Sequence, residues 1–150
     1  MGRAARYRAA ASFEGASLVQ YQSRETVDGY SGLIRATLVW AAFERYLKVC
    51  GLSQDNCGPL LEPHNPRAIA DEVAGHDAGG RLFEYIRRRV TNKTLAKQLD
   101  AYAQAKEFNV SYLLSAIRHI FGHGHLTPGS NETDARTTIA VCEILNSFHL

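Results

Sequence analysis

The side chains best suited to chemistry lie in one short segment, SYLLSAIRHIFGHGHLTP, at positions 111–128. Three of the six histidines, His119, His123 and His125, fall within seven positions there, and Arg118 directly precedes them. An imidazole accepts or donates a proton near neutral pH. A guanidinium is always charged and its planar fork binds phosphate oxygens in a bidentate way. The segment therefore predicts a site where a proton is transferred beside a fixed cation.

These groups suit the cleavage of an RNA phosphodiester without a metal ion. The reaction needs a base for the 2′-hydroxyl proton, a cation for the charge that develops on the phosphate oxygens, and an acid for the departing 5′-oxygen. One arginine and one histidine do not fill all three roles. Two-fold dimers are the commonest assemblies of soluble proteins, and a dimer that places Arg118 and His123 beside their symmetry mates supplies two of each. We therefore expect an RNA substrate and a homodimer.

A helix followed by a glycine turn must position these residues. Apolar residues at helical spacing predict a helix over residues 108–121 with one inward face, made of Val110, Leu113, Leu114, Ile117, Ile120 and Phe121. The opposite face is then expected to carry Ser111, Ser115 and Arg118, with Tyr112 and His119 beside them. Gly122 is placed to stop the helix, and Gly124 allows a positive φ beside His123.

The rest of the chain also predicts helices, over about residues 28–50, 66–74, 81–90, 93–106 and 131–148. Gly51 is placed to end the first of these, and Asn131 is a good N-cap for the last, with Asp134 three residues on. Residues 53–66 contain three prolines and predict a connecting loop. Since no repeat and no alternating run suggests a strand, we expect an all-α fold, an up-and-down bundle of four long helices with shorter pieces.

The length of 150 residues matches one domain, so a single helical domain is expected over residues 1–150. Residues 1–25 show the least regular pattern and fit a mobile, basic N-terminal arm or a frayed terminus.

Trp40 and Phe43 lie on the apolar face of the expected helix over 28–50 and are predicted to be core residues. Cys50 and Cys142 are expected to be small buried residues.

The composition excludes several classes of protein. With 45% hydrophobic and 21% charged residues, the chain is neither disordered nor collagen-like. Its net charge of +2 is too small for nucleic-acid binding by global charge, so any such site must be local. Charged residues interrupt the most apolar stretch, 33–49, which argues against a membrane span. Three cysteines without a CxxC pair indicate a reduced, cytoplasmic chain.

Arg118, the polar residue His119 and, after three more residues, His123 resemble the R-x4-6-H motif of the HEPN family (higher eukaryotes and prokaryotes nucleotide-binding domains). The HLTP run at 125–128 is similar to one in bacterial members. The resemblance covers most of the chain and implies a helical bundle that dimerises through the motif. It further implies a metal-independent endoribonuclease, often the toxin of a toxin–antitoxin or phage-defence system, with Arg118 and His123 catalytic and His119 in a supporting role.

The chain departs from one subset of this family. In members that a partner nucleotidyltransferase silences, the motif extends to a tyrosine two residues after the histidine, whereas this chain has His125 there. The resemblance therefore implies an antitoxin partner without supporting silencing by tyrosine adenylylation.

Other interpretations of the same residues stay open. Arg118 and His123 can be cations at a helix C-terminus, where the helix dipole favours positive charge. The chain is then a non-catalytic module that binds a partner or a nucleotide. His119, His123 and His125 can bind a metal ion, but no carboxylate or thiolate lies close in sequence and the spacing matches no familiar zinc motif. We therefore expect neither a metal nor a cofactor.

The densest basic run is Arg87, Arg88 and Arg89, followed by Lys93 and Lys97. On a helix, these side chains spread around much of the circumference. A solvated face is the simpler interpretation, and a track for an RNA backbone is the alternative.

Overall fold

The computed structural model of the chain describes residues 2–21, 23–104, 106, 108–129 and 132–150. Within these ranges every regular element is a helix, which confirms the predicted all-α class. No helix of this described part has the length and apolar character needed to cross a membrane. The helices are α1 (Gly2–Ser12), α2 (Arg24–Val49), α3 (Gly58–Leu61), α4 (Pro66–His76), α5 (Arg81–Arg89), α6 (Lys93–Ala103), α7 (Ser111–Gly122) and α8 (Ala135–His149), with 3₁₀ turns η1 (Gln54–Asn56) and η2 (Glu62–His64).

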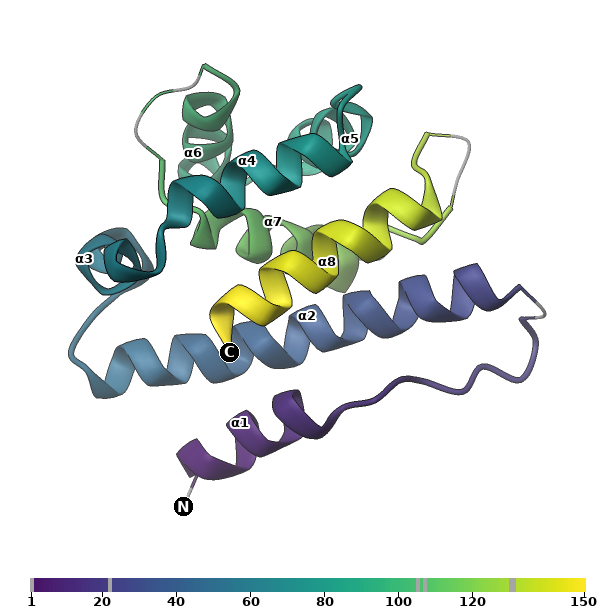
Figure 1. The fold of residues 1–150 in the computed structure, drawn as a ribbon, viewed down its shortest axis with the longest axis horizontal. Helices are drawn as coiled ribbons and strands as arrows, with labels where there is room; N and C mark the ends of the chain where they lie inside the picture. Colours follow the sequence, from purple (N-terminus) through teal and green to yellow (C-terminus); the bar gives the residue numbers. More distant parts are fainter. Residues whose placement is uncertain (1, 22, 105, 107, 130–131) are drawn as a thin grey trace.

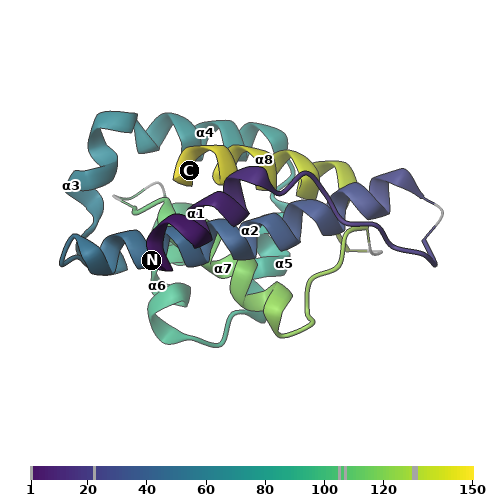
Figure 2. The ribbon, with the colours of Figure 1, turned by 90° about the horizontal axis from the view of Figure 1, so that it is seen from below.

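The long helix α2 organises the fold. It contacts α1, α7 and α8, while α4 packs on α8, and α5 and α6 pack on α7 (Figures 1 and 2). The side chain of Ser23 caps its start by accepting a hydrogen bond from the N–H of Thr26. Its end is closed by Gly51, which has a φ of 70° and lets the N–H of Leu52 bond to the carbonyl of Leu47 at 2.8 Å.

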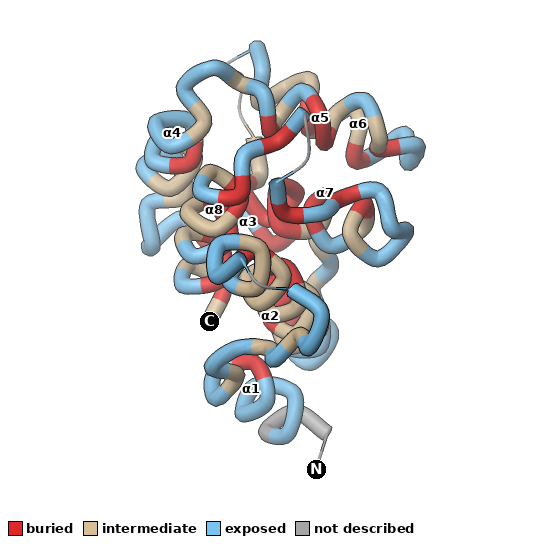
Figure 3. The backbone as a smooth tube through the Cα atoms, turned by 90° about the vertical axis from the view of Figure 1, so that its right-hand side faces the viewer, coloured by how far each residue is buried: buried red, intermediate tan, exposed pale blue. Residues whose placement is uncertain are grey.

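The core includes the faces on which α2, α7 and α8 meet, and Figure 3 shows buried stretches of the chain gathered in the interior between these helices. Leu33, Ala36 and Val39 of α2 are fully buried there. Trp40 and Phe43 are buried too, which confirms the prediction that they are core residues. Fully burying an aliphatic side chain of this kind contributes roughly 1.5–3 kcal/mol.

The chain begins with a helix that the sequence pattern does not predict. In place of an arm without structure, Gly2–Ser12 form α1, which lies along α2 with Ala10 fully buried (Figure 2). The segment after α1 is fixed to α2 because the N–H of Ala16 donates to the hydroxyl of Ser31 at 2.9 Å. Contact with α2 therefore stabilises a short, alanine-rich helix whose apolar pattern is weak.

Three further predictions differ from the structure. Helix α8 begins at Ala135 with Asp134 as its N-cap, not at Asn131, which lies outside the described residues. The side chain of Asp134 accepts from the N–H of Thr137 at 3.3 Å, so the acidic residue caps the helix.

The other two differences concern a cysteine and the proline-containing loop. Cys50 is exposed, because it follows the last residue of α2, whereas Cys142 is buried as predicted. The loop predicted over residues 53–66 contains η1, α3 and η2.

A close contact joins α2 to the segment between α7 and α8. Gly29 lies on the buried side of α2 against the ring of Pro128, and a Cβ placed on Gly29 would lie 2.2 Å from the Cβ of Pro128. No side chain fits in that space, so glycine is required there for packing rather than for its φ angle. The contact fixes the segment that follows α7 against the central helix.

Replacing Gly29 by alanine tests this contact. We expect Gly29→Ala to lower the free energy of unfolding by roughly 1–3 kcal/mol, because the new methyl group overlaps Pro128. Gly75→Ala in α4 is the matched control, since nothing lies within 4 Å of its Cβ position, and it should be neutral or stabilise by up to about 1 kcal/mol. Urea denaturation measures both, and equal effects of the two variants would show that Gly29 makes no special contact.

His149 is a buried histidine at the end of α8, with only 8% of its surface exposed. Its Nδ1 lies 2.7 Å from the carbonyl oxygen of Leu145, so Nδ1 carries the proton and donates it. The rings of Phe43 and Phe148 each lie 5.0 Å from the imidazole and meet it edge to face. Burial in these surroundings lowers the pKa of His149 to about 4.

This pKa predicts a loss of stability in acid. The folded chain holds the pKa of His149 below the ordinary value of about 6.5, so the unfolded chain binds more protons between these two pH values. Because of His149 alone, the free energy of unfolding should therefore fall by about 3 kcal/mol as the pH drops from 6.5 to 4. Denaturation at several pH values should show a smaller fall for His149→Phe than for the wild type. His76→Phe, at an exposed position, should keep the wild-type slope.

Candidate functional site

The end of α7 positions the residues singled out from the sequence. Arg118 and His119 lie in its last turns, Gly122 is its last residue and His123 is the C-cap. Gly124 has a φ of 73°, as its place in the sequence predicts. Its N–H donates to the carbonyl of Phe121 at 2.9 Å, and the N–H of His125 donates to the carbonyl of Ile120 at 2.8 Å. This pair of bonds is a Schellman motif, which folds the chain back so that the histidines after the helix stay near its end.

The turn brings the three imidazoles together. The ring centroids of His119 and His123 are 4.6 Å apart and the rings meet edge to face, while those of His123 and His125 are 6.5 Å apart. Arg118, His123 and His125 are exposed, and His119 is half-buried. The structure therefore gathers a cation and three imidazoles, two of them exposed, at the C-terminal end of a helix, where the backbone dipole favours positive charge.

The electrostatics of this group set His119 apart. Partial burial lowers its pKa from the ordinary value, and the nearby charges of His123, Arg118 and His125 lower it further. His119 is therefore neutral at pH 7 and keeps one ring nitrogen free of a proton. A neutral imidazole can accept a proton from a hydroxyl group or orient a neighbouring ring through a hydrogen bond.

The start of α7 differs from the prediction. Ser111 and Tyr112 are buried rather than placed on a solvent-facing side with Arg118. The hydroxyl of Ser111 accepts from the side-chain amide of Gln54 at 3.3 Å, and the hydroxyl of Tyr112 donates to Asp55. Because η1 packs over this first turn, polar side chains that face away from the apolar stripe still find partners inside the protein. The open face of α7 begins nearer its C-terminus.

The loop after α7 is fixed at several points. The hydroxyl of Tyr85 in α5 donates to the backbone carbonyl of His125. Leu126 is 1% exposed and belongs to the core, and Pro128 packs on Gly29. Two histidines thus lie on a turn whose backbone is held by α2 and α5. Such preorganisation suits a site in which proton donors and acceptors must stay aligned.

The basic run near this loop takes part in ion pairs. Arg87 forms a bidentate pair with Asp100 of α6, at 2.6 and 2.9 Å. Arg88 and Arg89 approach Glu132 at 3.4 and 3.7 Å, and the guanidinium of Arg89 lies 4.7 Å above the ring of Tyr85. The arginines therefore connect α5 to α6 and to the segment before α8. Arg88, Lys93 and Lys97 are exposed and Arg87 and Arg89 are partly exposed, so the run forms a largely solvated face that is partly paired with acidic side chains. Its use as a track for an RNA backbone stays a prediction.

Tyr85 and Glu132 are site-supporting residues that the sequence does not reveal. Both act through partners distant in the chain, and no spacing rule connects them to His125. By contrast, the sequence could have indicated the role of Gly29. A glycine within an apolar helical pattern often marks a place where another segment approaches the helix closely.

The interpretation of the histidines as a metal site gains no support from the geometry. Within the described part of the chain, no three histidine, cysteine, aspartate or glutamate side chains come together in a way that can hold a metal ion.

Comparisons with known proteins identify no relative. The chain matches no protein-family model, no curated protein and no solved structure.

The coupling among the histidines can be measured directly. In an NMR titration, we expect His119 to titrate below the ordinary value of about 6.5, since burial and the neighbouring cations disfavour its charged form. His123→Ala should raise the pKa of His119 because it removes one of these cations, while burial keeps the value below normal. His64→Ala, in η2, is the control and should leave it unchanged. A pKa of His119 at or above 6.5 in the wild type would contradict the arrangement.

Proposed function

We propose that this protein is a metal-independent endoribonuclease of the HEPN type that acts as a homodimer. The observation that carries the proposal is the exposed group at the end of α7, where Arg118 stands in the same turn as an imidazole pair 4.6 Å apart. The R-x4-6-H spacing of Arg118 and His123 supports it, as does the all-α fold.

In the proposed reaction, the 2′-oxygen of one nucleotide attacks the adjacent phosphorus. A neutral imidazole takes the 2′-hydroxyl proton, the bond from phosphorus to the 5′-oxygen breaks, and a protonated imidazole gives its proton to that oxygen. His123 is assigned to proton transfer, because it is exposed on the turn. Arg118 binds the charge that develops on the non-bridging oxygens. His119, neutral at pH 7, supports His123 from the preceding turn.

The dimer completes this site. One copy offers a single exposed arginine in the turn next to His123, whereas two copies related by a two-fold axis provide two cations and paired acid and base groups. The end of α7 is open to solvent, so a second copy can approach it. We further propose that the protein is the toxin of a bacterial toxin–antitoxin or defence system, acting in the cytoplasm and silenced by an antitoxin protein.

A non-catalytic interaction module is the second candidate. It is favoured by the position of His123 as the C-cap of α7 and of Arg118 in the adjoining turn, where cations stabilise a helix end without any chemistry. In that case the exposed group is a contact for a partner or a nucleotide.

Cleavage of RNA in the presence of EDTA distinguishes the two candidates. We expect the wild type to cut single-stranded RNA, and His123→Ala and Arg118→Ala to reduce the rate by roughly 10²–10⁴-fold, because each removes a proton-transfer or charge-stabilising group. Arg67→Ala and His76→Ala, which change exposed residues of α4, should cut at the wild-type rate.

Activity that survives both site substitutions would contradict the assigned roles, and absence of cleavage of any RNA pool would favour the interaction module. Size-exclusion chromatography with light scattering tests a separate requirement, namely that the protein forms a dimer. A strictly monomeric protein would remove the paired site on which the mechanism depends.

A further inference from the structure

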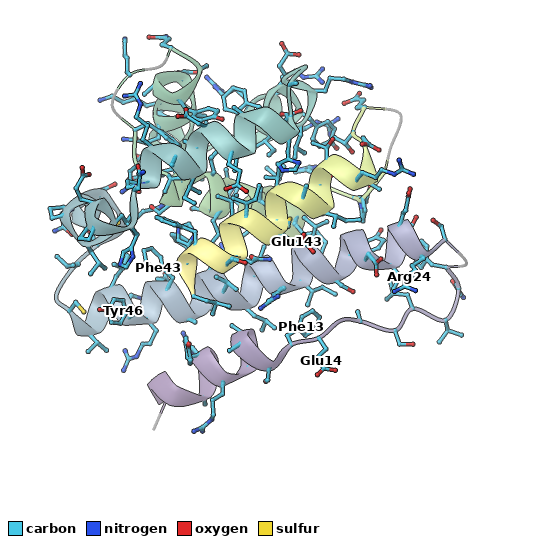
Figure 4. All side chains as sticks on the ribbon, viewed as in Figure 1. Phe13, Glu14, Arg24, Phe43, Tyr46 and Glu143 are labelled. Atoms are coloured by element: carbon cyan, nitrogen blue, oxygen red, sulfur yellow. The ribbon has the colours of Figure 1, made fainter. Side chains whose placement is uncertain are left out.

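A cavity lies away from the end of α7. It has a volume of about 830 Å³ and lies among α1, α2, α3 and the end of α8. We call it the α8-end pocket and define it by its walls Ala42, Phe43, Tyr46, Leu60, Phe148 and His149. Figure 4 shows Phe43 and Tyr46 on the part of α2 that lies near α3 and the end of α8.

The size and lining of the α8-end pocket suit a small molecule. Ligand sites in proteins are typically about 300–1,000 Å³ and are lined by apolar and aromatic side chains with a few polar groups. No aspartate, glutamate, lysine or arginine side chain is among the described residues that line this pocket. The lining also includes the imidazoles of His64 and His149. A ligand with a fixed charge would find no aspartate, glutamate, lysine or arginine side chain to pair with there, so the lining favours an uncharged molecule.

One polar group of this wall lacks a partner. The Nδ1–H of His149 is bonded to the carbonyl of Leu145, whereas Nε2 is buried and has no hydrogen-bond partner among the described residues. Because Nδ1 carries the proton of the neutral ring, Nε2 presents a lone pair and can only accept. A buried acceptor without a partner is costly and uncommon in folded proteins. It therefore points to a donor that comes from outside the chain.

We propose that the α8-end pocket binds an uncharged, mainly apolar small molecule with one hydroxyl or N–H group, and that this group donates a hydrogen bond to Nε2 of His149. The half-buried ring of Phe148 meets the imidazole edge to face at a centroid distance of 5.0 Å and also lines the pocket. Nε2 is itself buried, so the proposed contact includes a turn of the Phe148 ring that opens Nε2 to the ligand. Phe43, the other aromatic neighbour of the imidazole, is buried in the core.

The α8-end pocket does not depend on the proposed ribonuclease activity. None of Arg118, His119, His123 and His125 lines it. A protein without cleavage activity can therefore still bind the ligand, and a nuclease can lack the ligand, so the two proposals fail separately.

Binding of N-phenyl-1-naphthylamine tests the pocket. This probe is apolar, carries one N–H donor and fluoresces more strongly in apolar surroundings. We expect saturable binding to the wild type and a loss of affinity of at least about tenfold in Ala42→Trp, because the indole fills the pocket. Ala68→Trp on the exposed side of α4 is the matched control and should bind like the wild type. Absence of saturable binding to the wild type, or equal binding to both tryptophan variants, would overturn the proposal.

The role of Nε2 is tested by a second probe of the same shape. In 1-benzylnaphthalene the N–H group is replaced by CH₂, and its affinity can be measured by displacement of the first probe. His149→Phe keeps an aromatic wall but removes the acceptor, so it should weaken N-phenyl-1-naphthylamine about five- to tenfold. It should leave 1-benzylnaphthalene nearly unchanged. Equal effects on both probes would overturn the assigned hydrogen bond.

A measurement on the wild type avoids any effect of substitution on folding. The ¹⁵N resonance of Nε2 in His149 should shift on addition of N-phenyl-1-naphthylamine, because its lone pair becomes hydrogen-bonded, and should shift less with 1-benzylnaphthalene. An Nε2 resonance that does not respond to either saturating probe would overturn the proposed contact.

Discussion

The buried face of α2 is the constraint on which the rest of the structure depends. Helices α1, α7 and α8 all pack against it, and α4, α5 and α6 are held through α7 or α8. At Gly29 the absence of a side chain lets Pro128 approach the helix backbone, so even the loop between α7 and α8 is fixed by α2. A disturbance of this face is transmitted to the histidine turn because closely packed interiors deform little.

The histidine turn depends on both local and distant contacts. The Schellman motif at Gly124 bends the chain, and Tyr85, Leu126 and Pro128 hold the bent segment in place. The exposed pairs of Arg88 and Arg89 with Glu132 each contribute little to stability, since pairs in water are typically worth 0–1 kcal/mol. These ion pairs help to fix the position of α5, and Tyr85 of α5 donates a hydrogen bond to the carbonyl of His125.

The histidines of this chain lie in different surroundings. His149 is neutral because burial opposes its charge, and its Nε2 offers a lone pair within an apolar wall. His123 and His125 are exposed at the surface, as is Arg118. His119 lies between these extremes, half-buried and with its pKa lowered both by burial and by its neighbours.

The sequence by itself determined the all-α class, the core positions Trp40 and Phe43, and the glycine turn that keeps the histidines near the end of α7. It could do so because helical periodicity and the φ preferences of glycine are local properties of the chain. Only the tertiary structure decided that α1 docks on α2, that Ser111 is buried and that the arginines of α5 pair with Asp100 and Glu132. Each of these depends on a surface supplied by a distant segment. No pattern within a single helix specifies which face another helix will cover.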